Sequence, residues 1–236
     1  GILGGYFAEA QGFDKEVCIS IKEHYLPAGI QGKIPKNNYS IALSVSDKID
    51  SLVGFFGLDL IPSSSKDPYA LRRLSIGLLK TVIENNLSLK IKELINYSCQ
   101  TYSEQSFSLD NKKILNELSK FIFDRFKNFM KEKGIRHDII ESSSIDYDLN
   151  KLLTIYKKSV FLQKNIKKQV GKDLIENYKR AFKILQSEND TILKGIQGSP
   201  DPAILKNDFE KLLYKKLNNI RKDLTSIKVE NDFNSQ

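Results

Sequence analysis

The sequence has few of the residues on which disulfides, metal sites and nucleophilic catalysis depend. It has two cysteines, two histidines and no tryptophan among 236 residues. Cys18 and Cys99 form no Cys-x-x-Cys or Cys/His pattern, which argues against a disulfide scaffold or a zinc site and fits a reducing compartment. No apolar run approaches the roughly 20 residues that span a bilayer, and no signal peptide is visible. We therefore expect a cytoplasmic protein with no membrane partner.

The shortage of histidine limits the catalytic chemistry further. His24 lies at an expected helix end, where a capping or packing role is the simpler interpretation. His137-Asp138 spells the dipeptide of HD-type metal phosphohydrolases, but such a site needs several His and Asp ligands around one metal. Gly171-Lys172 lacks the upstream glycine and the following Ser or Thr of a phosphate-binding loop. The sequence predicts no catalytic residue, no metal site and no cofactor bound by this segment.

The positive charge is present but unevenly distributed. The formal net charge is +8. Residues 151–222 contain 17 Lys and Arg against 7 Asp and Glu, a local net charge of +10, so the remainder of the chain carries −2. A basic second half and a nearly neutral first half indicate a polyanionic partner for one part only. The alternative is a lysine-rich solvated surface of compositional origin.

The hydrophobic pattern predicts an all-α fold, because apolar residues recur at three- and four-residue steps and strand-like alternation is absent. The Gly- and Pro-rich first forty residues are expected to be irregular apart from one short helix. Asp67-Pro68 and Asp201-Pro202 are expected to begin helices, and Ser142–Ser144 is the expected linker. The predicted helices are Phe13–Tyr25, Tyr39–Phe56, Asp67 to about Asn86, Ile91–Thr101, Asn111–Lys133, Asp148–Lys168, Lys172–Ile196 and Asp201–Ile227.

Four short stretches of the chain carry more information than periodicity. They are Gly1–Tyr6, Glu23–Pro27, Ser44–Gly57 and Ser65–Arg73. Together they resemble the beta subunit of the bacterial two-subunit glycyl-tRNA synthetase, which reads close to A-D-K-L-D-T-L-V-G-F-F and then K-D-P-F-A-L-R-R. The spacing between the stretches also matches. The resemblance is strong over residues 1–90 and looser, but in register, from 110 to about 225.

The resemblance implies both a domain plan and a function. Residues 1–105 would be the latter part of an HD-like helical bundle, 106–147 a connecting helix with a Ser-rich linker, and 148–236 the first helices of a DALR-like anticodon-binding domain. In the family the alpha subunit holds the class II active site, ATP is used to make glycyl-adenylate, and the subunits form a heterotetramer. The expected partners are tRNA(Gly) and the alpha subunit. Because the sequence lacks an initiator methionine and stops before further expected helices, we expect a piece of a longer subunit.

Two arginines and one aspartate within the resembling stretches are candidate site residues. Asp47 matches a carboxylate that metal-binding HD proteins use as a ligand, but without partner histidines we expect it to pair with Lys48, Arg72 or Arg73. Arg72 and Arg73 lie near a helix start, where unpaired backbone donors favour phosphate. They are therefore predicted to contact the RNA backbone, with buried ion pairs as the open alternative.

A second basic set is expected to follow one side of consecutive helices. Backbone neutralisation by such residues gives affinity that falls steeply with salt. Tyr156, Tyr178 and Phe182 are interleaved with them and could stack on unpaired bases, although Tyr178 and Phe182 could equally be core residues. The predicted RNA-binding residues of this set are Lys164, Lys167, Lys168, Lys172, Lys179, Arg180 and Lys183.

Two other classes of function remain open at this point. One is a helical protein-interaction module that binds a partner through its apolar stripes, independently of salt. The other is an HD-type metal phosphohydrolase remnant, which would need a bound metal.

Overall fold

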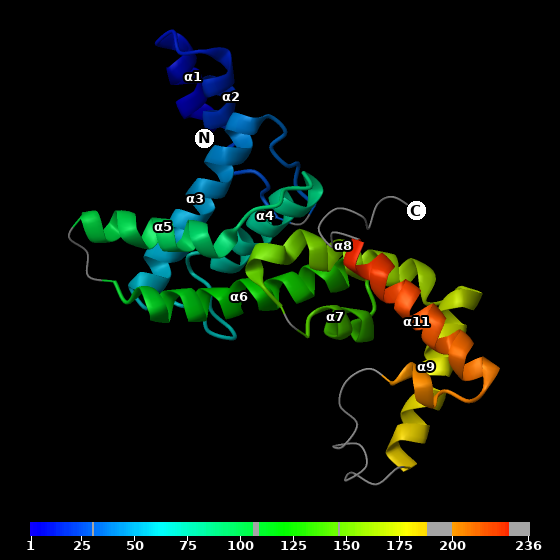
Figure 1. The fold of residues 1–236 in the computed structure, drawn as a ribbon. Coiled ribbons are helices and arrows are strands. Elements are labelled where there is room, and N and C mark those ends of the chain that lie inside the picture. The colour runs from blue at the N-terminus through cyan, green and yellow to red at the C-terminus, as the bar shows by residue number, and fades with distance from the viewer. Residues whose placement is uncertain (30, 106–108, 146, 188–199, 227–236) are drawn as a thin grey trace. The chain divides into compact units, whose positions relative to one another are not determined.

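The chain is all-α over the residues that the structure, a computed structural model, describes: 1–29, 31–105, 109–145, 147–187 and 200–226. No β-strand occurs in these ranges, which confirms the predicted fold class. Figure 1 shows the helices in order along the chain. They are α1 (Ile2–Ala10), α2 (Lys15–Glu23), α3 (Asn38–Gly57), α4 (Leu71–Glu84), α5 (Ile91–Glu104), α6 (Asn111–Glu132), α7 (His137–Ser143), α8 (Leu152–Asn165), α9 (Gln169–Ser187) and α11 (Asp208–Ser226), with 3₁₀ turns at Leu149–Lys151 and Pro202–Ile204.

The chain divides into two compact units. The first comprises Gly1–Val160 and the second Phe161–Gln236, so the division falls within α8. The domain limits suggested by the resemblance, at 105 and 147, remain predictions. The two units also differ in burial, because among the described residues none after Ser159 is buried.

Helix α3 forms the centre of the first unit, where it packs against α2, α4, α5 and α6 (Figure 1). Its apolar stripe explains this position, because Leu52 and Val53 are completely buried. Helix α6 contributes an equally regular stripe, with Ile122, Phe126 and Phe129 also completely buried. These side chains recur at three- and four-residue steps, so each helix presents one continuous apolar face to the core.

Buried lysines hold the loop between α2 and α3 against the core. Lys48 Nζ donates to the backbone carbonyl oxygens of His24 at 3.0 Å and Leu26 at 2.8 Å, and to Ser44 Oγ at 2.7 Å. Lys80 Nζ donates to the Gly32 carbonyl at 2.6 Å. The loop carbonyls are thus satisfied by side chains of α3 and α4 in place of water.

The prediction for the start of the chain is wrong, because the glycine-rich segment forms α1. Glycine lowers helix propensity, but here it permits close contact with α2. A Cβ on Gly5 would overlap the Lys22 side chain and lie 2.8 Å from the Cys18 carbonyl oxygen. Lys22 also forms an ion pair with Glu9 at 3.0 Å. Tertiary packing therefore outweighs the local preference.

Both Asp-Pro pairs lie ahead of the helices that they were expected to begin. Asp67 still caps α4, since its carboxylate accepts hydrogen bonds from the backbone N–H of Leu71 at 2.9 Å and of Arg72 at 3.0 Å. Asp201 caps only the 3₁₀ turn Pro202–Ile204, and α11 begins at Asp208. Aspartate accepts from whichever donors the backbone presents, so a cap does not fix the length of the element that follows.

The Ser-rich stretch that was expected to be a linker is the end of α7. Ser143 and Ser144 are buried, because Ile139 and Ile140 of the same short helix are themselves buried. The predicted helix Asp148–Lys168 is divided into the 3₁₀ turn and α8. The predicted helix Lys172–Ile196 begins earlier, at Gln169, and its residues 188–196 lie outside the described ranges.

Candidate nucleic-acid interface

The predicted basic residues of the second unit lie on α8, on α9 and in the short connection between them. All seven are exposed. None forms an ion pair with any residue that the structure describes. Their charges are therefore available to an external anion. We call this set the basic face: Lys164, Lys167, Lys168, Lys172, Lys179, Arg180 and Lys183.

The geometry of α9 aligns part of the basic face. Lys172, Lys179 and Lys183 are separated by seven and four residues, so they lie on one side of the helix. Gly171 permits the tight connection that precedes them, because a Cβ at this position would overlap the Asn165 carbonyl oxygen. The backbone N–H of Lys168 also donates to Asn165 at 3.0 Å. The connection thus keeps Lys167 and Lys168 close in sequence and space to the start of α9.

Tyr178 and Phe182 form an exposed aromatic pair on α9. Their ring centroids are 6.0 Å apart with an interplanar angle of 15°. Tyr178 is 66% exposed and Phe182 is 47% exposed, so neither is a core residue in this structure. Each precedes a lysine of the basic face by one residue, which places the rings on the neighbouring side of the helix. Tyr156, in contrast, lies on α8 with its ring 6.3 Å from that of Phe129.

Arg72 and Arg73 differ in their environments. The Arg72 guanidinium donates to the Ser63 carbonyl oxygen and lies 3.9 Å from Asp67, which ties it to the loop before α4. Arg73 is exposed and forms no ion pair with a described residue. The α4 backbone donors expected to favour phosphate already bind Asp67. Of the two arginines, Arg73 is the one available to a ligand.

Asp47 does not pair as expected. It forms no hydrogen bond or ion pair with Lys48, Arg72 or Arg73. Lys48 follows it directly on α3, so the two side chains point in directions about 100° apart. Burial lowers the pKa of Lys48 to about 8, while the nearby charge of Asp47 acts in the opposite direction.

Histidine and cysteine have structural positions. His24 Nδ1 lies 2.7 Å from the Ile21 carbonyl oxygen at the end of α2, which confirms the capping interpretation. His137 lies 3.9 Å from Glu141 on the surface. Cys18 and Cys99 are buried and free. Within the described ranges, no group of three or more His, Cys, Asp or Glu side chains could hold a metal ion, and no helix is both long and apolar enough to cross a membrane.

Fold and site together define an all-α protein with an exposed basic helical surface. Comparison with known proteins then gives the family. Residues 1–144 match the family model described as glycyl-tRNA synthetase beta subunit. The chain belongs to this family.

Several curated relatives extend the match over nearly the whole chain. The glycine–tRNA ligase beta subunit of Clostridioides difficile (strain 630) is 31% identical over 94% of this chain and 31% of its own length. That of Rickettsia canadensis (strain McKiel) is 33% identical over 99% of this chain and 33% of its own length. That of Rickettsia bellii (strain OSU 85-389) is 35% identical over 91% of this chain and 30% of its own length. The chain thus spans about a third of the length of these relatives.

Proposed function

We propose that this chain serves glycine–tRNA ligase by binding tRNA(Gly) and by supporting assembly with the catalytic alpha subunit in a heterotetramer. The whole enzyme would join glycine to its tRNA with ATP, and this segment would bind neither ATP nor metal. Family membership and the names of the relatives support the proposal. The single observation that carries the RNA-binding part is the basic face, whose cations have no described ion-pair partner.

The physical argument rests on counterion release. Cations that are not neutralised within the protein displace the ions condensed on a nucleic-acid backbone, and this release provides affinity that depends on salt. The exposed pair Tyr178 and Phe182 lies beside the lysines of α9 and offers ring faces to unpaired bases. Lysines would therefore supply affinity, and the rings would favour a tRNA region whose bases are unstacked.

The first prediction concerns the salt dependence of tRNA binding. Replacing Lys172, Lys179 and Lys183 together by glutamine removes three cations from one side of α9. We expect weaker binding to a tRNA(Gly) transcript and a shallower plot of log K against log salt concentration. Each lost phosphate contact contributes roughly 0.7–0.9 to that slope, so the slope should fall by about two to three. Fluorescence anisotropy from 50 to 300 mM salt, on the order of the range over which such affinities change, measures it.

The matched control removes the same charge elsewhere. Lys36, Lys112 and Lys120 are equally exposed but lie in the first unit. Their triple glutamine variant should keep the wild-type slope. Equal slopes for wild type and the α9 variant would refute the role of the basic face.

A second candidate function is a helical protein-interaction module. It is favoured by the exposed apolar side chains of α11, among them Phe209, Leu213 and Ile220. This function predicts binding to a protein that is insensitive to salt and no affinity for tRNA. The same anisotropy measurement distinguishes the two. The remaining alternative, a metal phosphohydrolase, has no supporting observation in the described ranges.

A further inference from the structure

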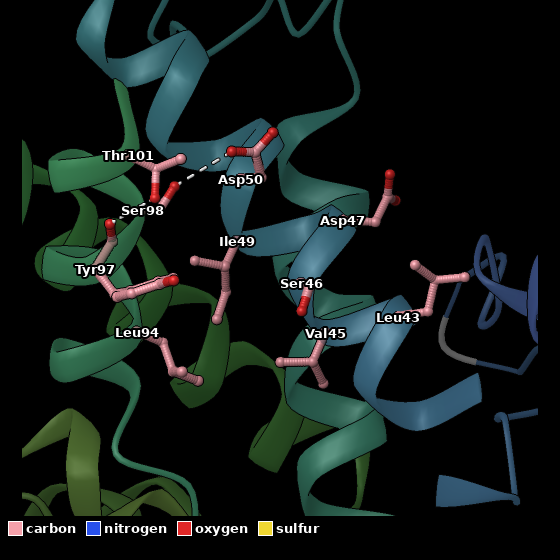
Figure 2. Close-up of a pocket in the computed structure, with 10 residues that line it drawn as sticks. All are labelled: Leu43, Val45, Ser46, Asp47, Ile49, Asp50, Leu94, Tyr97, Ser98 and Thr101. Atoms are coloured by element: carbon pink, nitrogen blue, oxygen red, sulfur yellow. Dashed lines mark hydrogen bonds between the residues drawn. The ribbon is translucent and has the colours of Figure 1, made fainter. Parts of the chain in front are cut away.

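A groove of about 410 Å³ lies between α3 and α5 in the first unit. Figure 2 shows Val45 and Ile49 of α3 pointing toward Leu94 and Tyr97 of α5, so the floor of the groove is apolar. Tyr97 is 71% exposed and stands at its edge. The volume is within the range of about 300–1,000 Å³ in which proteins bind small groups or side chains.

The charged side chains that line this groove are both acidic. Asp47 and Asp50 lie one turn apart on α3, and no Lys, Arg or His is among the lining residues. Asp50 accepts hydrogen bonds from Ser98 Oγ at 3.3 Å (dashed in Figure 2) and from Tyr102 Oη at 3.4 Å. Burial raises the pKa of Tyr102, and the charge of Asp50 and its hydrogen bond act in the same direction. Both donors are neutral hydroxyl groups, so neither supplies a positive charge to Asp50.

Asp47 supplies the second negative charge, and its surroundings differ from those of Asp50. It is half-buried and forms no hydrogen bond or ion pair with a residue that the structure describes. In Figure 2 it lies with Leu43 on the side of α3 away from α5. A carboxylate in this position gains from an external cation, because its water shell is already incomplete. A phosphate backbone would be repelled here, although the chain as a whole has a net charge of +8.

We propose that this acidic groove, defined by Val45, Asp47, Ile49, Asp50, Leu94 and Tyr97, binds a basic amphipathic segment of a protein partner. One apolar side chain of the segment lies between Ile49 and Leu94, and a Lys or Arg cation lies near Asp50, while Asp47 adds negative charge from the other side of α3. Tyr97 can also present its ring face to that cation. The negative charge of the groove favours a cationic partner, and its apolar floor favours one that also carries hydrophobic groups. A polyamine has the positive charge but no hydrophobic side chain.

The test uses the full chain and defined peptide probes. Methyl NMR spectra would follow Val45, Ile49 and Leu94 during titration with acetyl-Leu-Leu-Arg-amide. The matched probe replaces arginine by citrulline, which has nearly the same shape and no charge, and spermine tests a cation without apolar groups. We expect the arginine peptide to shift these methyl signals with about two- to fivefold higher affinity than the citrulline peptide, as for a partly exposed ion pair. Spermine should leave the methyl signals unchanged.

Variants connect the effect to the two carboxylates. Asp47→Asn with Asp50→Asn should reduce the affinity of the arginine peptide to that of the citrulline peptide. Asp124→Asn, an exposed aspartate on α6 outside the groove, should have no effect. The comparison of peptides on the wild-type chain stands even if the double variant fails to fold. Equal affinity of the two peptides, equal shifts with spermine, or a dimer of this chain that dissociates in the double variant would each overturn the proposal.

Discussion

Lys48 is a lysine whose ammonium lies among oxygen atoms of the main chain and of Ser44, with no carboxylate within ion-pair distance in the described ranges. Its side chain is only 2% exposed. Gly77 of α4 makes room for it, since a Cβ there would be 2.9 Å from Lys48 Cε. A buried ammonium that meets only neutral oxygens is stabilised by hydrogen bonds but loses its hydration.

The pKa of this residue predicts how stability depends on pH. Burial lowers the pKa of Lys48 from 10.5 to about 8. Between these two values the unfolded chain binds more protons than the folded one, so the free energy of unfolding should rise as pH increases from about 8 to 10.5. A difference of one in pKa corresponds to about 1.4 kcal/mol, which gives an upper bound of about 3 kcal/mol.

Urea unfolding of the wild type and of Lys48→Met at several pH values measures this effect. Other groups titrate equally in both proteins, so the difference between the two free energies isolates Lys48. Lys48→Met should be less stable at every pH, because the His24 and Leu26 carbonyls lose their donor. A difference that is constant or shrinks from pH 8 to 10.5 would contradict the assignment.

The core position of Lys48 was not predicted, although the sequence contains a signal for it. Ser44 and Leu52 are four residues away on either side and are both buried, so Lys48 lies on the same face of α3. Because the stretch Ser-Asp-Lys-Ile-Asp is mostly polar and charged, its lysine was expected to lie outside the buried stripe. The capping role of Asp67 was predicted correctly, but its reach to Leu71 and the capture of Arg72 by Ser63 depend on loop conformation. Neither contact can be predicted from the spacing of residues along the sequence.

At the scale of elements, α1 and α2 contact each other through glycine. Gly4 and Gly5 both face α2, but with different clearance. A Cβ on Gly4 would lie 3.2 Å from a methyl group of Ile21, whereas a Cβ on Gly5 would lie 2.8 Å from a backbone oxygen. A side chain can rotate away from a new methyl group more easily than a helix backbone can move.

Alanine substitution of these two glycines separates helix propensity from packing. Both variants gain roughly 0.5–1 kcal/mol of helix propensity. Gly5→Ala should nevertheless destabilise α1 by about 1–3 kcal/mol because the helices must separate, and Gly4→Ala should be neutral or stabilising. Native-state hydrogen exchange of the α1 amides measures both. Similar protection in the two variants would show that α2 does not limit the space at Gly5.

Helices with a repeated stripe of buried apolar residues were predicted best, whereas the 19-residue α11, which has no described buried residue, begins seven residues after its expected start. α3, α5 and α6 begin within one residue of the expected positions, since each has a regular series of buried apolar residues. α7 was missed because it has only seven residues, too few turns for a pattern to stand out. α1 has nine residues, as many as the predicted α2, but its glycines indicated irregular structure. In α1 the decisive contact is with another helix, and a single-helix pattern cannot contain it.

At the scale of the whole molecule, the two units differ in how their helices are supported. α6 carries several completely buried side chains, among them Ile122 and Phe126, whereas no described residue of α9 or α11 is buried. Most helical stability in proteins comes from the packing of an apolar face. Helices of the second unit therefore depend more on their own propensity than those of the first unit.

Amide hydrogen exchange of the intact chain should reflect this difference. We expect α6 amides to exchange more slowly than those of α11, by a factor on the order of 100 or more, because opening α6 requires disruption of the core. Mass spectrometry of peptic peptides after timed exchange gives both rates. If α11 is as protected as α6, its exposed apolar side chains are covered in solution.

The function of the whole molecule was predicted from the resemblance of short motifs to a known family, and not from candidate catalytic or binding residues. Stretches such as Ser44–Gly57 pointed to the family that the comparisons then showed, whereas charge and periodicity alone indicated only a helical protein with a basic half. The exposure of the basic face could be expected from helical spacing. The acidic groove could not, because it forms between residues of α3 and α5 that are about 50 positions apart.

The capping of α4 by Asp67 has a consequence for anions in solution. A carboxylate attached to the same chain is present at the helix end at an effective concentration of the order of millimolar or higher. Any phosphate group that approached the amides of Leu71 and Arg72 would have to displace this tethered competitor. The start of α4 thus disfavours phosphate groups, which the free backbone N–H groups of other helix starts bind readily. This selectivity against anions is a property of the folded chain itself.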